Sequence, residues 1–200
     1  MDRPANVVPI SALRKERQAR RRVGREPPAA ARRPYRLDEV RIPELVAALN
    51  AWRQIAPQGV FRYDTAGAMA TLLQAGLLTE FSVMISATDP DPMNWLLLWW
   101  GSGYDAYSRT SAIGRTISEL PNDDLVGESI KDYRDVIERR QPVVSCLTGS
   151  IIEGHSDGAP VYRVVGYDRI AFPLVDDLGE VRRLITVSKM FQGNWNEEEE

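Results

Sequence analysis

Two apolar segments near the carboxyl end decide the fold, and they lie within YDRIAFPLVDDLGEVRRLITVS at residues 167–188. Ile170, Phe172 and Leu174 occupy every second position of the first segment, which is the spacing of a strand with one buried face. Between the segments, DDLGE is typical of a tight reverse turn, with Gly179 available for a positive φ angle. The pattern therefore predicts two antiparallel neighbouring strands.

Working outward along the chain, three further apolar segments are predicted as strands, namely FSVMIS at 81–86, WLLLWW at 95–100 and VVSCLTGSII at 143–152. The turn-rich ATDPDPMN separates the first two, and its prolines cannot donate ladder hydrogen bonds, so a hairpin is the simplest assembly. Trp99 and Trp100 are adjacent, so we expect them on opposite faces of the sheet. One should face the covering helices, and the other needs the leading helices or a second chain as a partner.

Helical spacing occurs in three places. Pro43 suits the first turn of a helix whose apolar residues recur every three or four positions as far as Ile55. A second helix ends near Gly76. A third, ESIKDYRDVIERRQP at 128–142, gathers its apolar residues on one stripe and is predicted to keep its charges on the other faces. Helices, a hairpin, short helices and then three strands predict an α+β fold, with an antiparallel sheet covered by helices on one face.

Charge is distributed unevenly along the 200 residues. Residues 1–36 carry eleven Lys/Arg against three Asp/Glu, a balance of +8. Because the net charge of the whole sequence is −3, the remaining residues carry a balance of −11. With many prolines and little apolar surface, residues 1–36 are predicted to be a basic, mostly disordered arm. The chain then divides into N-terminal helices at 37–80, a sheet domain at 81–191 and an acidic tail at 192–200.

The composition also bounds the compartment. The longest apolar run, six residues from Trp95 to Trp100, is far below the roughly 18 to 20 residues that cross a bilayer. The amino terminus becomes basic where a secretory signal would be apolar. A single cysteine, Cys146, allows no internal disulfide and no multi-cysteine zinc site. These features predict a cytoplasmic protein without a membrane span.

Three phrases resemble the PAS sensor fold. SGYDAYSRTSAIGRTISEL at 102–120 is similar to the PAS segment in which a short helix leads to a glycine and a polar residue, here Gly114 and Arg115, and then to a hydrophobic-Ser-Glu-Leu phrase. DYRDVIERRQPV at 132–143 resembles the long PAS helix before a proline-led third strand, and the segment at 167–188 resembles the closing PAS hairpin. Each phrase is weakly specific, and their order and spacing carry the resemblance.

The resemblance covers residues 40–191 and implies a PAS-like five-stranded antiparallel sheet with helices covering one face and an N-terminal helical extension. It is similar to bacterial single-domain PAS proteins that begin with a tryptophan-bearing helix, as LNAWRQIAPQGVFRYD does here. The chain lacks the cysteine phrase of flavin-binding members, and His155, its only histidine, lies in a polar turn rather than near the long helix. We therefore expect neither flavin nor haem, and leave an unidentified small ligand open.

No catalytic constellation emerges from the residues. Cys146 and His155 would need spatial contact and an orienting third group to form a nucleophilic pair. GSG at 101–103 lacks the later glycine and lysine of a phosphate loop. The candidate site is instead a pocket between the sheet and the short helices, where PAS relatives hold their ligands, and a fully packed core is the alternative. Its expected wall residues are Trp99, Tyr104, Arg115, Tyr133 and Arg163.

These observations lead to three hypotheses. The first is a non-enzymatic cytoplasmic PAS-like sensor or adaptor, which acts through protein–protein contacts that a small ligand can gate, and which can form a homodimer through residues 37–80. The second is a nucleic-acid-associated protein that uses the Arg-rich arm. The third is an enzyme that uses Cys146 as a thiolate nucleophile. No metal site is predicted under any of the three.

Overall fold

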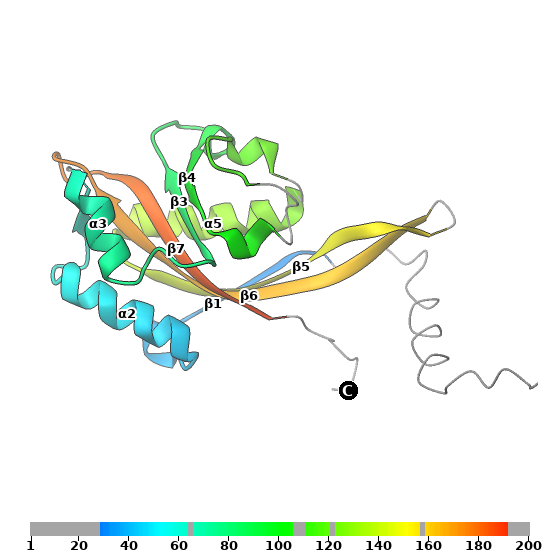
Figure 1. Cartoon of the computed structure of the whole chain (residues 1–200), viewed down its shortest axis with the longest axis horizontal. Coiled ribbons are helices and arrows are strands. Elements are labelled where there is room, and N and C mark those ends of the chain that lie inside the picture. Colours follow the sequence, from blue (N-terminus) through cyan, green and yellow to red (C-terminus); the bar gives the residue numbers. More distant parts are fainter. Residues whose placement is uncertain (1–28, 64–65, 106–110, 121–122, 157–158, 192–200) are drawn as a thin grey trace, which may run out of the picture.

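The computed structural model describes residues 29–63, 66–105, 111–120, 123–156 and 159–191. The acidic tail at 192–200 and residues 1–28 of the predicted arm lie outside these ranges. The described residues form one twisted sheet between two layers of helices, and a long hairpin extends beyond the sheet at one end (Figure 1).

The sheet contains seven strands in the described part of the chain. Its order is β1–β5–β6–β7–β3–β4, with β2 beside β6. All pairs are antiparallel except β2–β6. The strands are β1 (Ala31–Tyr35), β2 (Phe61–Arg62), β3 (Ser82–Ser86), β4 (Leu96–Trp100), β5 (Val143–Ser156), β6 (Ala159–Val175) and β7 (Val181–Phe191). The predicted α+β class with an antiparallel sheet is confirmed, and the five predicted strands are β3 to β7.

The structure contains two strands, β1 and β2, in addition to the five that were predicted. β2 is only two residues long, too short to be detected as a periodic pattern. β1 lies inside the segment that was predicted to be a disordered arm, so the boundary at residue 36 is wrong. This strand has no apolar alternation that could have revealed it. It is held at the sheet edge by pairing with β5 from Ala31↔Thr148 to Tyr35↔Val144, and by ion pairs of Arg32.

Helices cover both faces of the sheet, not one. α2 (Pro43–Ile55) and α3 (Ala66–Gln74) lie on one face, and α5 (Asp123–Arg139) lies on the other (Figure 1). Trp52 of α2 is buried and stacks on Phe172 of β6, with 4.7 Å between ring centroids. The N-terminal helical extension is thus the second cover of the sheet, because the apolar stripe of α2 has the even-numbered residues of β6 to pack against.

Several local predictions are confirmed. α2 begins at Pro43. α3 ends where Gly76 adopts φ 71°, and the N–H groups of Gly76 and Leu77 donate back to the carbonyls of Leu73 and Leu72, which is a Schellman cap. Gly179 adopts φ 77° in the β6–β7 turn.

Short 3₁₀ helices connect the remaining elements. They are η1 (Leu37–Glu39), η2 (Pro92–Asn94), η3 (Ser102–Tyr104) and η4 (Ile117–Glu119). η2 begins at the last proline of the DPDP segment, which lies in the connection between β3 and β4 as its prolines predict. η3 and η4 lie on the same side of the sheet as α5, and their buried residues Tyr104 and Ile117 join the apolar cluster of that side.

The glycines of GSG serve the backbone of this region. The N–H of Gly101 donates to the carbonyl of Ser82, and the N–H of Gly103 donates to the carbonyl of Glu80. A side chain on Gly101 would overlap the Glu80 carbonyl, so only glycine fits this close approach. Both amide groups are therefore occupied within the chain and are not free to bind a phosphate.

Candidate functional site

A cavity of about 120 Å³ lies between the inner face of the sheet and α5. A pocket was one of the two predicted alternatives, and the structure contains it in place of a fully packed core. Most of the lining is apolar or aromatic. The lining residues are Val83, Ile85, Leu97, Trp100, Tyr104, Ile117, Leu120, Leu125, Val126, Ser129, Tyr133, Val165, Tyr167, Arg169, Thr186 and Met190.

The polar centre of the cavity wall is Arg169, which β6 supplies. Its side chain is only 3% exposed. Nη1 donates to the Tyr133 hydroxyl at 3.0 Å, and Nη2 donates to Asp132 Oδ2 at 2.6 Å. The guanidinium carbon also lies 4.8 Å from the centre of the Tyr133 ring and 5.6 Å from that of Tyr167. Two aromatic rings and a carboxylate therefore fix this cation in place.

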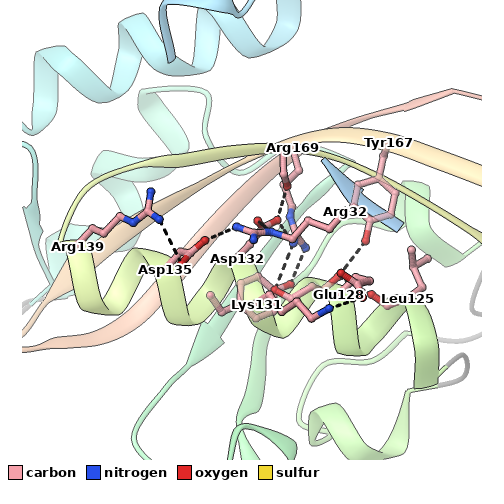
Figure 2. Close-up of polar contacts among 12 residues, drawn as sticks. Arg32, Leu125, Glu128, Lys131, Asp132, Asp135, Arg139, Tyr167 and Arg169 are labelled. Atoms are coloured by element: carbon pink, nitrogen blue, oxygen red, sulfur yellow. Dashed lines mark hydrogen bonds and ion pairs between the residues drawn. The ribbon is translucent and has the colours of Figure 1, made fainter. Parts of the chain in front are cut away.

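Asp132 joins the cavity wall to the edge of the sheet (Figure 2). Its carboxylate is 1% exposed and accepts hydrogen bonds from Arg169 of β6, Arg32 of β1 and the hydroxyl of Ser145 in β5. Arg32 also pairs with Asp135, one turn further along α5. The result is a continuous path of charged contacts from the cavity, through α5, to the first strand.

The ionisation of this network follows from its geometry. Burial alone would raise the pKa of Asp132, but the charge of Arg169 and the hydrogen bonds from Arg169, Ser145 and Arg32 outweigh it, so the pKa lies below its usual range. Burial disfavours the charged form of Arg169, yet Tyr133 and Asp132 raise its pKa. Burial raises the pKa of Tyr133 to about 12. At neutral pH the pair is thus ionic and the tyrosine is neutral.

One donor of this network has no partner in the part of the chain that the structure describes. Arg169 Nε is buried and makes no hydrogen bond within the described residues. The backbone carbonyl of Ser129, at 3.4 Å, is reached by Nη2 and not by Nε. Most buried donors in proteins are satisfied, so an unpartnered one in a cavity wall indicates a place for an acceptor.

The structure places the five predicted wall residues differently from one another. Tyr104 and Tyr133 line the cavity, where their rings are buried. Trp99 lies on the opposite face of the sheet, where its indole N–H donates to Ser82 Oγ at 3.0 Å and its ring packs against the α2 side. Arg115 is exposed, and Arg163 lies in β6 opposite Ile151 in β5.

The two adjacent tryptophans lie on opposite faces, as the sequence predicts. Trp100 lines the cavity, and Trp99 packs with the cluster of the leading helices. The prediction chose the wrong tryptophan for the cavity, because a register shift between Met84 and Ile85 of β3 leaves Leu98 of β4 without a pairing partner on β3. Such a bulge changes which side chains face inward and is not visible in the alternation of residues.

Arg169 and Asp132 are the residues that sequence reasoning missed. Charges of the long helix were expected on its outer faces, but Ser129, Asp132, Tyr133 and Val136 form its buried stripe at helical spacing. Arg169 is the neighbour of Ile170 in the sequence, so the prediction of a strand with one buried face places its side chain on the outer face. Because helices cover both faces of the sheet, the positions that alternate with Ile170 and Phe172 are buried too. An acidic residue within an apolar helical stripe was the available signal.

The geometry around Cys146 bears on the enzyme hypothesis. Burial raises the pKa of this thiol, and the Asp168 carboxylate adds to the effect, which disfavours a thiolate at neutral pH. Cys146 and His155 lie nine positions apart on the same strand, β5. At about 3.3 Å per residue this is a separation on the order of 30 Å along the strand. These two positions do not meet, so they do not form the pair that the hypothesis requires.

The remaining site classes can be checked within the described residues. No group of three or more His, Cys, Asp or Glu there could hold a metal ion. In the same part of the chain, no helix combines the length and the apolar character that spanning a bilayer requires.

Comparison with known proteins yields matches among solved structures only. No protein-family model matches the chain, and no curated protein matches it. A structure of a light-oxygen-voltage domain, which concerns a flavin analogue, is 14% identical over 64% of this chain and 87% of that chain, with a TM-score of 0.43. The dark structure of the blue-light photoreceptor Aureochrome1 LOV is 15% identical over 66% and 89%, with a TM-score of 0.42.

A third structure is that of an RNA-binding light-oxygen-voltage receptor, 13% identical over 84% of this chain and 40% of that chain, with a TM-score of 0.47. Light-oxygen-voltage domains are a subclass of the PAS family, the family that the sequence resembles. The TM-scores lie below 0.5, so these matches by themselves settle nothing about this chain. Ligand and activity rest on this chain's own residues.

The cavity can be tested for a flavin, the group that the first of these structures concerns. Pockets that enclose drug-sized ligands measure roughly 300–1,000 Å³, whereas this one measures about 120 Å³. The chain's single cysteine does not line it, because Cys146 lies beside Tyr35 and Asp168 on the α2 side of the sheet. The residues present therefore do not fit a flavin. That the chain carries neither flavin nor haem stays a prediction.

Proposed function

We propose that this chain is a non-enzymatic cytoplasmic sensor and adaptor, in which a small molecule in the cavity controls contacts with a protein partner. The observation that carries the proposal is the path Arg169–Asp132–Arg32, which joins the cavity wall to β1. A ligand that accepts from Arg169 shares the charge of this guanidinium with Asp132. The attraction between Asp132 and Arg32 changes with it.

β1 is the element on which such a change acts. It has five residues, it lies at the sheet edge, and no described strand pairs with its outer side. Arg32 supplies its links to α5. An edge strand that loosens leaves β5 open to pairing with another chain, which is one of the ways in which proteins recognise extended segments.

A homodimer through residues 37–80 is part of the same proposal. The apolar stripe of α2 is buried on the chain's own sheet, so the dimer contact would use the outer surface of α2 and α3. Leu73 of α3, which is 59% exposed, lies on that outer surface.

The function is tested on protein purified from its own host. Native mass spectrometry reports a retained small molecule and the oligomeric state together, and light scattering checks the latter at high concentration. We expect a bound small molecule and a dimer, or a partner protein in a crosslinked pull-down. A strict monomer without ligand or partner would contradict the proposal.

The basic arm supports the second candidate, association with nucleic acid. Arg33 and Arg36 are the described members of the arm's arginine set that are exposed. Affinity that depends on phosphate contacts falls steeply as salt concentration rises. Binding of single-stranded RNA by the full chain, measured between about 50 and 200 mM salt, would show such a slope. Salt-independent binding, or none, would remove this candidate.

A further inference from the structure

The unpartnered Nε of Arg169 specifies what the cavity's occupant must offer. Both terminal nitrogens of this guanidinium already have acceptors, in Tyr133, Asp132 and the Ser129 carbonyl, while Nε has none among the described residues. Arg169 itself lines the cavity. A buried guanidinium N–H is only a donor, so the occupant has to supply an acceptor oxygen or nitrogen.

The charge of Arg169 favours an anion. Five ionic groups form the described network: the guanidinium groups of Arg32, Arg139 and Arg169, and the carboxylates of Asp132 and Asp135. Arg139 is 66% exposed, and the four less exposed groups, two guanidinium groups and two carboxylates, balance one another. The preference for an anion therefore comes from Arg169 itself, because a hydrogen bond between two charged groups is stronger than one to a neutral acceptor.

The other residues that line the cavity determine the size and the polarity of the rest of the occupant. Val83, Ile85, Leu97, Ile117 and Val165 face a space of about 120 Å³. An apolar cavity of about 150 Å³ holds one benzene molecule, so the space accepts roughly one ring or a short branched chain. A sugar or a nucleotide is too large and too polar for these walls.

We propose that the cavity binds a compact monocarboxylate with an apolar body of about one ring, and that its carboxylate accepts a hydrogen bond from Arg169 Nε. This assignment rests on the proposed function, because it names the occupant of the sensor cavity. The binding is ionic at one end and apolar elsewhere, which is the usual division of labour in small-molecule sites.

The test uses the full chain with benzoate as the probe and benzamide, its neutral counterpart of similar shape, as the comparison. Isothermal titration calorimetry measures the dissociation constant of each. A hydrogen bond between two charged groups contributes more than one to a neutral acceptor, so we expect benzoate to bind at least about tenfold more tightly. Equal affinities would overturn the assignment of an anion, and absence of benzoate binding would overturn the ligand class.

Two variants locate the binding. Val126→Phe on α5 fills the cavity from a half-buried position, while Val46→Phe on α2 adds the same volume on the opposite face of the sheet. We expect Val126→Phe to weaken benzoate binding at least about tenfold and Val46→Phe to leave it unchanged. Arg169→Lys keeps the charge and removes Nε, and should abolish the preference for benzoate. Since that variant can fail to fold, Val126→Phe keeps the proposal falsifiable, and unchanged binding in it would overturn the site.

The failure of this assignment and that of the sensor function can be told apart. If benzoate does not bind but protein from the host carries another small molecule, the ligand class is wrong and the sensor function stands. If benzoate binds in the cavity and no partner or dimer is found, the site is right and the adaptor function is wrong.

Discussion

Asp132 is the residue on which the buried network depends. It is 1% exposed and forms ion pairs with two guanidinium groups, whereas Asp135 is 23% exposed. Asp132→Asn leaves buried positive charge without its partner, so we expect it to lower the free energy of unfolding by about 3–5 kcal/mol. The matched Asp135→Asn should cost about 0–1 kcal/mol. Urea unfolding of both variants measures the difference, and equal effects would contradict the central role of Asp132.

The same carboxylate predicts a dependence of stability on pH. Its pKa in the folded chain lies below that of an unfolded aspartate, which is about 3.9. Its contribution is therefore complete above about pH 4 and is lost as the pH falls through the folded pKa. Burial raises the pKa of Asp168, so this residue changes stability with pH in the opposite sense. The informative quantity is therefore the difference in unfolding free energy between wild type and Asp132→Asn. Between pH 5 and 3, wild type should lose more stability than Asp132→Asn, measured by urea unfolding.

Glycine substitutions separate a backbone role from a ligand role in the GSG segment. Gly101→Ala forces a methyl group into the Glu80 carbonyl, so we expect a loss of about 1–3 kcal/mol in unfolding free energy. Gly127 of α5 has open space around it, and Gly127→Ala should instead stabilise the chain by roughly 0.5–1 kcal/mol. Thermal unfolding of both variants checks the opposite signs. A neutral Gly101→Ala would show that the close approach is not required.

At this scale the sequence predicts the residues whose role is local. Gly76 and Gly179 follow from turn chemistry, and Tyr104 and Tyr133 from their place in the cover of the sheet. Arg169 and Asp132 were missed because their burial depends on what packs against each face, and a sequence pattern does not state how many faces are covered. Trp99 was misplaced because one unpaired residue in β4 shifts the alternation.

β1 gives the sharpest test at the scale of the element. Arg32 and Arg33 are neighbours, but Arg32 pairs with Asp132 and Asp135, while Arg33 is exposed. Arg32→Gln should speed hydrogen exchange of the β1 amides by about tenfold or more, because charged hydrogen bonds to α5 are lost. Arg33→Gln should leave exchange unchanged. Equal exchange in both variants would show that ion pairs do not hold the strand.

Elements with a strong period were the predictable ones. The helix from Pro43, the long helix and the strands at both ends of the domain carry enough apolar residues in phase to be identified. β1 was not identifiable, because its ARRPY sequence joins the sheet through partners one hundred residues away. The position of α2 could not be predicted either. Its apolar stripe indicates that one side of the helix is buried, but the sequence does not show that the partner surface is the second face of the sheet.

For the whole molecule, the position of β1 moves the functional boundary of the arm. Removing residues 1–28 takes away no described part of the sheet, so we expect the free energy of unfolding to stay within about 0.5 kcal/mol of the full chain. Removing 1–36 deletes β1 and its ion pairs, and should cost about 3–5 kcal/mol. Urea unfolding compares the two truncations. Tests of nucleic-acid binding by the arm therefore need the shorter deletion, since the longer one also disturbs the sheet.

The order of strands in the sheet has a consequence for biosynthesis. β1 pairs with β5 and β2 pairs with β6, so the strands within the first 62 residues find their partners only after residue 142. A ribosome that adds roughly 5–20 residues per second needs on the order of ten seconds to synthesise the chain from β2 to the last strand, β7. Until then α2 lacks the surface that covers Trp52. Folding of this chain is therefore largely post-translational, and its emerging amino-terminal half is the part that a chaperone would meet.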